Sequence, residues 1–301
     1  MSDGGEGFLD AFSGEEFLVE LNGPLGAPIK ARALLCEAKT GVLGIVESAE
    51  AIGRQLVVHP TSSMALQASS RPLGDLLAAL QHAGATQLLV GLGGSATTDG
   101  GQGVFQALAE HGGLTVPLTV ACDVEVPYLG ALAFAQQKGI AERDLAQVEQ
   151  MLLHTADRFA LATGIDPTPL SGAGAAGGVG GALLCLGGIA VPGAALVAEQ
   201  SGLGEALKDA TVLITGEGAL DATSLQGKVV GHLLRTAPPS CAVIVLAGSA
   251  KGSILCDLEA LRPGTRVVVF DQAVETAHAL NSPLTVATAL LDDIFWPSNS
   301  D

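Results

Sequence analysis

Aromatic side chains are scarce in this chain. They make up 3% of its 301 residues, with one tryptophan and one tyrosine. The interior must therefore be built from alanine, leucine, valine and isoleucine packed close to the backbone of the 40 glycines. With 48% apolar residues, this profile is typical of an α/β enzyme-like protein. It excludes a collagen, a disordered chain and a small disulfide-stapled fold.

Basic residues are also few. Acidic residues outnumber them 31 to 14, the formal net charge is -17, and no run of lysine or arginine occurs. Nucleic-acid backbones and anionic membrane surfaces repel such a chain. We therefore expect no nucleic-acid partner and no membrane partner.

Patterns for metal binding and export are missing as well. The five cysteines are never spaced CxxC, and the six histidines form no HExxH or HxH pattern, so no structural zinc site is expected. The first residues, MSDGGEGFLD, have neither the basic flank nor the apolar core of a signal peptide. We expect reduced thiols and a cytoplasmic location.

One charge-free segment, residues 172–191, has the length of a membrane-spanning helix and contains GxxxG spacings. Its many glycines, Pro192 directly after it and the acidic neighbours Asp166 and Glu199 all argue against a membrane span. We expect a soluble segment here.

Short apolar runs that end in glycine or aspartate recur along the chain, as is typical of buried strands, at residues 87–95, 118–123, 211–218, 242–249 and 266–271. Helical patterns lie between or after them, at residues 73–84, 103–112, 144–161, 231–237 and 282–295. Alternating strands and helices predict a largely parallel sheet, with ligands at the carboxyl ends of its strands.

The first sixty residues differ, because two alternating stretches flank a turn from Asn22 to Gly26 and predict an antiparallel hairpin. The length fits two domains. We therefore predict an α/β protein with a mixed-sheet domain carrying glycine-rich loops over residues 1–190, and a flavodoxin-like or Rossmann-like parallel domain over residues 191–301.

Two glycine-rich segments are candidate anion sites. GLGGSATTDGGQG begins at Gly91 between a predicted strand and a predicted helix, where backbone N–H groups, hydroxyls and a helix N-terminus favour an anion. It matches neither a Walker A loop nor a clean GxGxxG motif. SGAGAAGGVGGA begins at Ser171. For each segment, close backbone packing is the alternative interpretation.

Carboxylates lie beside glycines at several predicted turns: Asp3, Glu6, Asp99, Asp123, Glu217 and Asp221. Solvated turn acids are one interpretation. Mg²⁺ binding together with proton acceptance during phosphoryl transfer is the other. Among the few cations, Arg71, Lys138 and Lys228 lie near the glycine-rich segments and could neutralise a phosphate or a carboxylate, although a lone lysine is often only a surface charge.

In combination these motifs resemble the bacterial glycerate kinases that form 2-phosphoglycerate. The matching segments run in family order: SDGGEG from Ser2, NGPLG from Asn22, GLGGSATTDGGQG from Gly91, ACDVEVPYLG from Ala121, FAQQKG from Phe134, SGAGAAGGVGGAL from Ser171, ITGEGALDATSLQGK from Ile214 and LAGS from Leu246.

The resemblance implies a kinase that uses ATP and Mg²⁺ to phosphorylate D-glycerate, with the active site between two domains, the mixed one being inserted into the parallel one. On this basis we expect Asp99, Asp123 and Lys228 to be catalytic and Glu217 and Asp221 to hold the metal ion. We expect ATP at Gly93, Gly94, Ser95, Ala96, Thr97, Gly172, Gly174 and Gly177. We expect the acid substrate at Asp3, Glu6, Arg71 and Lys138.

The chain also departs from the family pattern. Members carry a further strand and an APDSFK-type loop ahead of the DGGEG segment, and a longer stretch between His111 and Leu118. Ala135 and Gln136 replace the Gly-Pro of FGPQKG, and Pro72 replaces a glycine. The alternative function is therefore a catalytically impaired, kinase-like protein, or a truncated fragment, that binds small molecules without converting them.

Overall fold

A computed structural model describes residues 4–225, 228–273 and 288. The chain divides into two compact units, residues 1–201 and residues 202–301. The sequence placed the boundary near residue 190, and the division falls after the helix that follows Pro192. Asp3 and the helix predicted at residues 282–295, except Thr288, lie outside the described residues.

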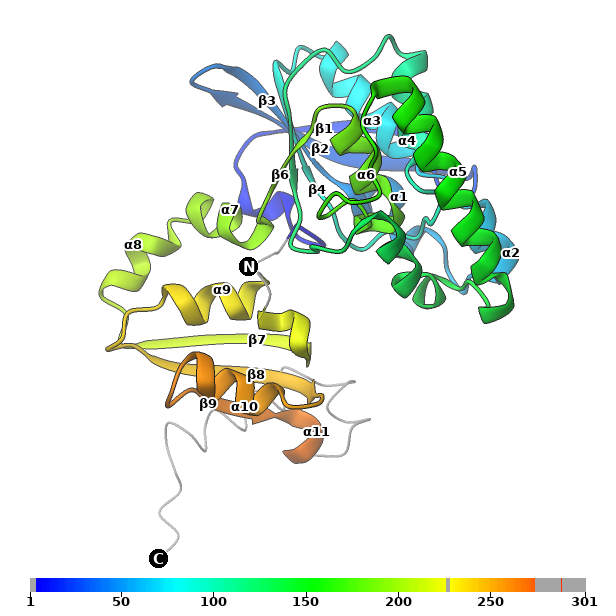
Figure 1. The fold of residues 1–301 in the computed structure, drawn as a ribbon. Helices are drawn as coiled ribbons and strands as arrows, with labels where there is room; N and C mark the ends of the chain where they lie inside the picture. The colour runs from blue at the N-terminus through cyan, green and yellow to red at the C-terminus, as the bar shows by residue number, and fades with distance from the viewer. Residues whose placement is uncertain (1–3, 226–227, 274–287, 289–301) are drawn as a thin grey trace, which may run out of the picture. The chain divides into compact units, whose positions relative to one another are not determined.

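A mixed six-stranded sheet forms the centre of the first unit (Figure 1). Its strands lie in chain order: β1 (Glu15–Asn22), β2 (Pro28–Ala38), β3 (Gly41–Glu47), β4 (Gln87–Gly91), β5 (Leu118–Ala121) and β6 (Ile189–Val191). Strands β1 to β3 are antiparallel, whereas β3 to β6 are parallel. The predicted hairpin is confirmed, and Gly26 turns it with a φ of 86° that favours glycine.

The helices of this unit are α1 (Ser48–Ile52), α2 (Ser62–Gln67), α3 (Arg71–His82), α4 (Gln102–Glu110), α5 (Leu145–Thr163), α6 (Val179–Cys185) and α7 (Gly193–Gln200). Six short 3₁₀ helices accompany them: η1 (Leu9–Ala11), η2 (Arg54–Leu56), η3 (Tyr128–Phe134), η4 (Gln136–Lys138), η5 (Glu142–Asp144) and η6 (Ala175–Gly177). The parallel strands advance in one direction, and right-handed crossovers then place their helices on one face of the sheet. Figure 1 shows α3 to α6 on that face.

Alternation along the strands divides the core between the two faces of the sheet. Val46, Leu88 and Val90 pack with leucines of α3, while Ile45 and Leu89 pack with Phe8 and Val197 of α7 on the other face. The buried residues of the cluster around α3 are alanine, valine, leucine and one isoleucine, as the scarcity of aromatics in the sequence predicts.

The second unit holds a separate three-stranded parallel sheet, β7 (Val212–Leu220), β8 (Ala242–Ala250) and β9 (Arg266–Val269), in that order. Its helices are α8 (Leu203–Lys208), η7 (Ala222–Leu225), α9 (Val229–Thr236), α10 (Ile254–Leu261) and α11 (Phe270–Ala273). The predicted α/β class, with one mixed and one parallel sheet, is confirmed.

The charge-free segment 172–191 folds into η6, the seven-residue helix α6 and β6. Over the described part of the chain, no helix is long and apolar enough to cross a membrane.

Candidate functional site

The loop between β4 and α4 is pinned by backbone hydrogen bonds. The N–H of Arg54 donates to the carbonyl of Gly94 (2.9 Å), and the N–H of Ala96 donates to the carbonyl of Ile52 (2.7 Å). The Ser48 hydroxyl accepts from the Gly93 N–H at 3.0 Å. The N–H groups of Gly93 and Ala96, which the sequence made candidates for anion binding, therefore hold the loop in place. Fewer backbone donors are left for an anion than the number of glycines in the loop predicts.

Lys138, the last residue of η4, contacts this loop. Its side chain is buried, with 6% exposed, and Nζ donates to Ser95 Oγ at 2.9 Å and to the Thr97 carbonyl at 2.7 Å. Gly139 follows with a φ of 98°, which ends η4 and lets the chain turn away. The lysine thus clamps a loop about forty residues earlier in the chain, a contact the sequence alone does not reveal.

The two glycine-rich segments meet at one hollow of about 190 Å³, which Lys138 also lines. Its wall includes Gly93, Gly94 and Ser95 from the first segment and Ala175, Ala176 and Gly177 from the second. No side chain fits at Gly177, because a Cβ there would collide with the Thr97 carbonyl oxygen. Gly177 therefore allows the two segments to approach each other and expose backbone to the hollow.

Gly172 and Gly174, also predicted to bind ATP, are not in this wall. A Cβ at Gly174 would collide with the carbonyl oxygen of Pro127, and a Cβ at Gly180 with that of Gly172. At Gly174 the structure favours the packing interpretation that the sequence had left open, whereas a Cβ at Gly172 would meet only the Val124 carbonyl oxygen, at 3.5 Å.

A second hollow of about 390 Å³ adjoins the first, and the two share Arg54, Gln137 and Lys138. Glu6, one of the predicted substrate residues, lines this second hollow together with His59. Sequence reasoning missed Arg54. Its signal was its position directly after Gly53 in a chain with only 14 basic residues.

Asp99, predicted to be catalytic, joins the starts of two helices. Its Oδ2 accepts from the Ser70 N–H (2.7 Å), the Ser70 hydroxyl (2.8 Å) and the Gly103 N–H (3.2 Å). Its Oδ1 accepts from the Gly101 N–H at 3.1 Å. These donors let the carboxylate hold the start of α4 and the glycine loop, and the catalytic role of Asp99 stays a prediction.

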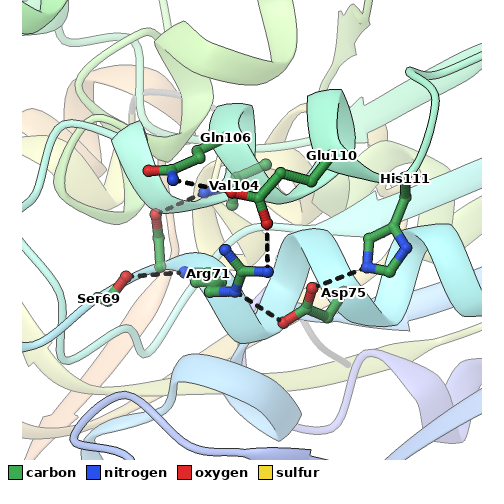
Figure 2. A network of polar contacts seen from close by, with 8 residues as sticks. Ser69, Arg71, Asp75, Val104, Gln106, Glu110 and His111 are labelled. Atoms are coloured by element: carbon green, nitrogen blue, oxygen red, sulfur yellow. Dashed lines mark hydrogen bonds and ion pairs between the residues drawn. The ribbon is translucent and has the colours of Figure 1, made fainter.

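Arg71, predicted to bind the acid substrate, forms ion pairs with two carboxylates. Figure 2 shows it between Asp75 of its own helix and Glu110 of α4, with distances of 3.4 and 2.6 Å. Asp75 also contacts His111 at 3.0 Å. Two carboxylates neutralise this arginine at the surface, and its ion pair with Glu110 ties α3 to α4. Arg71 lines neither of the two hollows.

Asp123 is buried two residues after the end of β5, where its Oδ2 accepts from the Ala194 N–H at 2.9 Å. This bond lies at the start of α7, where a carboxylate favours the helix N-terminus. The next residue, Val124, belongs to the wall of the first hollow.

In the second unit, Glu217 of β7 and Lys228 at the start of α9 form an ion pair, with 3.2 Å between Oε1 and Nζ. The other carboxylate oxygen of Glu217 is buried and has no hydrogen-bond donor among the described residues. An unused buried carboxylate oxygen fits a ligand of Mg²⁺, which takes one or two carboxylates plus water and phosphate. Asp221 follows in the turn after β7, where its backbone N–H donates to Ser224 Oγ at 3.1 Å. The described residues contain no cluster of three or more metal-ligating side chains.

The model of the glycerate kinase family matches residues 1–112 and 111–294. The chain belongs to this family. A glycerate kinase of Halalkalibacterium halodurans is 33% identical over 288 residues, which cover 83% of this chain and 75% of that protein. The glycerate 2-kinase of Escherichia coli is 34% identical over 268 residues, covering 76% and 69%.

An uncharacterized protein of Mycobacterium tuberculosis is 40% identical over 278 residues, covering 87% of this chain and 71% of that one. Among solved structures, a protein named as a glycerate kinase 2 from Salmonella typhimurium LT2 matches with a TM-score of 0.66 and 28% identity, over 96% of this chain and 88% of that one. The glycerate kinase membership inferred from the motifs is thus confirmed. The family supports a kinase with ATP as its phosphate donor.

Within this glycerate kinase fold, the motif residues separate into two groups. Gly93, Gly94, Ser95, Gly177 and Lys138 converge on one hollow. Others hold the framework around it, and Asp99 and Arg71 are the clearest of these.

Proposed function

We propose that this chain transfers the γ-phosphoryl group of ATP to the 2-hydroxyl of D-glycerate, giving 2-phosphoglycerate and ADP. One observation carries the proposal. Glycines assigned to ATP and the lysine assigned to the acid line the same hollow. Phosphoryl transfer requires donor and acceptor to meet at one place, and its catalysis is mostly positioning and charge stabilisation.

In the reaction, the bond from the γ-phosphorus to the β–γ bridging oxygen breaks and a bond to the glycerate hydroxyl oxygen forms. Lys138 and Arg54 supply positive charge beside the exposed backbone of Gly93 and Gly177. We assign acceptance of the hydroxyl proton to Asp123, beside the hollow wall at the carboxyl end of β5, and charge neutralisation in the second unit to Lys228.

Mg²⁺ would neutralise phosphate charge in this reaction. Glu217 is the proposed ligand with the better support, because one of its oxygens is buried and unused among the described residues. Asp221 in the following turn is the second. The cytoplasm, where ATP is available, is the proposed compartment.

A coupled assay of ADP release tests the proposal, with D-glycerate, L-glycerate and no acid as parallel reactions, and with ³¹P spectra to locate the phosphate on the product. We expect release only with D-glycerate and Mg²⁺, and strong loss in Lys138→Met. Lys30→Met, which removes a surface lysine paired with Glu20, is the matched control. Binding of both substrates without ADP release would instead favour the impaired, kinase-like binding protein.

A further inference from the structure

Lys138 is a buried amino group whose partners are all neutral. Its hydrogen bonds go to a hydroxyl, Ser95 Oγ, and to a backbone carbonyl, that of Thr97. Within the described ranges, no carboxylate lies within ion-pair distance of its Nζ, although the chain has more than twice as many acidic as basic residues. Buried ammonium groups in proteins are normally paired with an anion.

The charged groups around Lys138 come from four segments. Arg54 of η2 lines both hollows with it and opposes its charge, whereas Asp99 of the glycine loop favours it. Glu6 and His59 line the second hollow from the N-terminal turn and from the segment after η2. Burial has the largest effect, Asp99 opposes it and Arg54 adds to it, and the pKa of Lys138 is lowered to about 7.

Counting hydrogens gives the consequence for binding. A neutral amine has two N–H groups, and the hydroxyl of Ser95 and the carbonyl of Thr97 accept both. A third N–H exists only in the ammonium form. When both N–H groups are used in this way, the neutral nitrogen presents its lone pair to the hollow, whereas the ammonium form presents a third N–H and a positive charge. An anion in the hollow therefore binds the protonated form of Lys138 more tightly than the neutral form.

We infer that an anion entering the first hollow binds together with one proton, which Lys138 takes up from solvent. Arg54 makes this uptake larger, since its fixed charge favours the neutral lysine while the hollow is without an anion. The inference rests on the proposed function only for the identity of the acid, D-glycerate.

The uptake can be calculated from the titration of Lys138. With a pKa of about 7 in the free protein, roughly a tenth of the side chains are protonated at pH 8. A neighbouring anion raises such a pKa by about 1 to 3 units. Binding at pH 8 should then take up between about 0.4 and 0.9 proton, and at pH 5.5 almost none, because Lys138 is already charged there.

Titration calorimetry measures this number directly, as the dependence of the binding heat on the ionisation enthalpy of the buffer. The probes are D-glycerate and, separately, sulfate, because neither gains or loses a proton between pH 5.5 and 9. Lys30→Met should keep the uptake at pH 8, whereas Lys138→Met should lose it and bind more weakly. Arg54→Gln, which leaves the lysine contacts in place, should reduce the uptake. If Lys138→Met does not fold, the proton uptake of Arg54→Gln decides whether the inference holds.

The outcomes separate this inference from the proposed function. Uptake with sulfate but no binding of D-glycerate would support the inference and contradict the proposed function. Binding of either anion with no uptake at pH 8, or uptake that is unchanged in both Lys138→Met and Arg54→Gln, would overturn the inference. Absence of binding by both anions would overturn the inference and the assigned acid site together.

Discussion

Replacing Asp99 by alanine tests whether this carboxylate holds the framework or takes part in the reaction. The structure gives it four hydrogen bonds, from the backbone and hydroxyl of Ser70 and from the N–H groups of Gly101 and Gly103. Asp99→Ala leaves these donors without their acceptor, and each buried donor left unpaired costs about 1–3 kcal/mol.

Because water can reach part of this site, we expect the free energy of unfolding to fall by about 3–5 kcal/mol. For a domain of this size, 1 kcal/mol corresponds to about 2–4 °C in melting temperature, so the variant should melt roughly 6–20 °C lower. Differential scanning calorimetry and circular dichroism measure the shift. Asp75→Ala, which removes a carboxylate from the surface network of Figure 2, should cost under about 1 kcal/mol.

The decisive comparison is between melting temperature and activity. A framework role predicts that the two fall together and that activity returns in part at low temperature, where the variant is folded. If Asp99→Ala melts at the same temperature as the unmodified protein but has lost phosphoryl transfer, the framework role is refuted and the predicted catalytic role is supported.

Three further predictions concern other parts of the chain. Gly177→Ala should abolish ligand binding in calorimetry. Gly187→Ala, at a similar φ but with no atom near the added Cβ, should bind normally and lose only about 1 kcal/mol of unfolding free energy. Equal binding by both variants would contradict the assignment of the first hollow as the ligand site. Arg262→Met removes hydrogen bonds to four backbone carbonyls and should speed hydrogen exchange in the second unit alone, unlike Arg266→Met on the exposed side of β9. Glu217→Gln should raise the Mg²⁺ concentration needed for half-maximal activity with little change in melting temperature; an unchanged Mg²⁺ requirement would exclude Glu217 as a ligand.

Much of the fold was predictable because its signals are local. The apolar runs at residues 87–95 and 242–249 became β4 and β8, and the turn after Asn22 became the hairpin. The long pattern from Asp144 became α5, which ends at Gly164 with a φ of 77°. Each of these depends on residues within one element or turn, so periodicity and glycine placement suffice.

The site was predictable only where its residues carry their own signal. The segments that contain Gly93 and Gly177 were identified because they are rich in glycine. The close approach of Gly177 to the Thr97 carbonyl, which brings the two segments together, depends on tertiary packing. Asp99 and Arg71 were singled out from their own segments, and their partners Ser70 and Glu110 lie in other segments of the chain. Partners far away in the sequence decide whether a charged side chain is bound by other residues of the protein or is left for a ligand. A single sequence does not show these partners.

The strand order of the first unit has a consequence for how the protein is made. From β2 to β6, every strand pairs with the strand synthesised just before it. A ribosome releases the chain from its N-terminus at about 5–20 residues per second, far slower than a hairpin forms. The sheet can therefore grow at one edge as each strand emerges, and each strand from β2 onward emerges after its first partner has been translated.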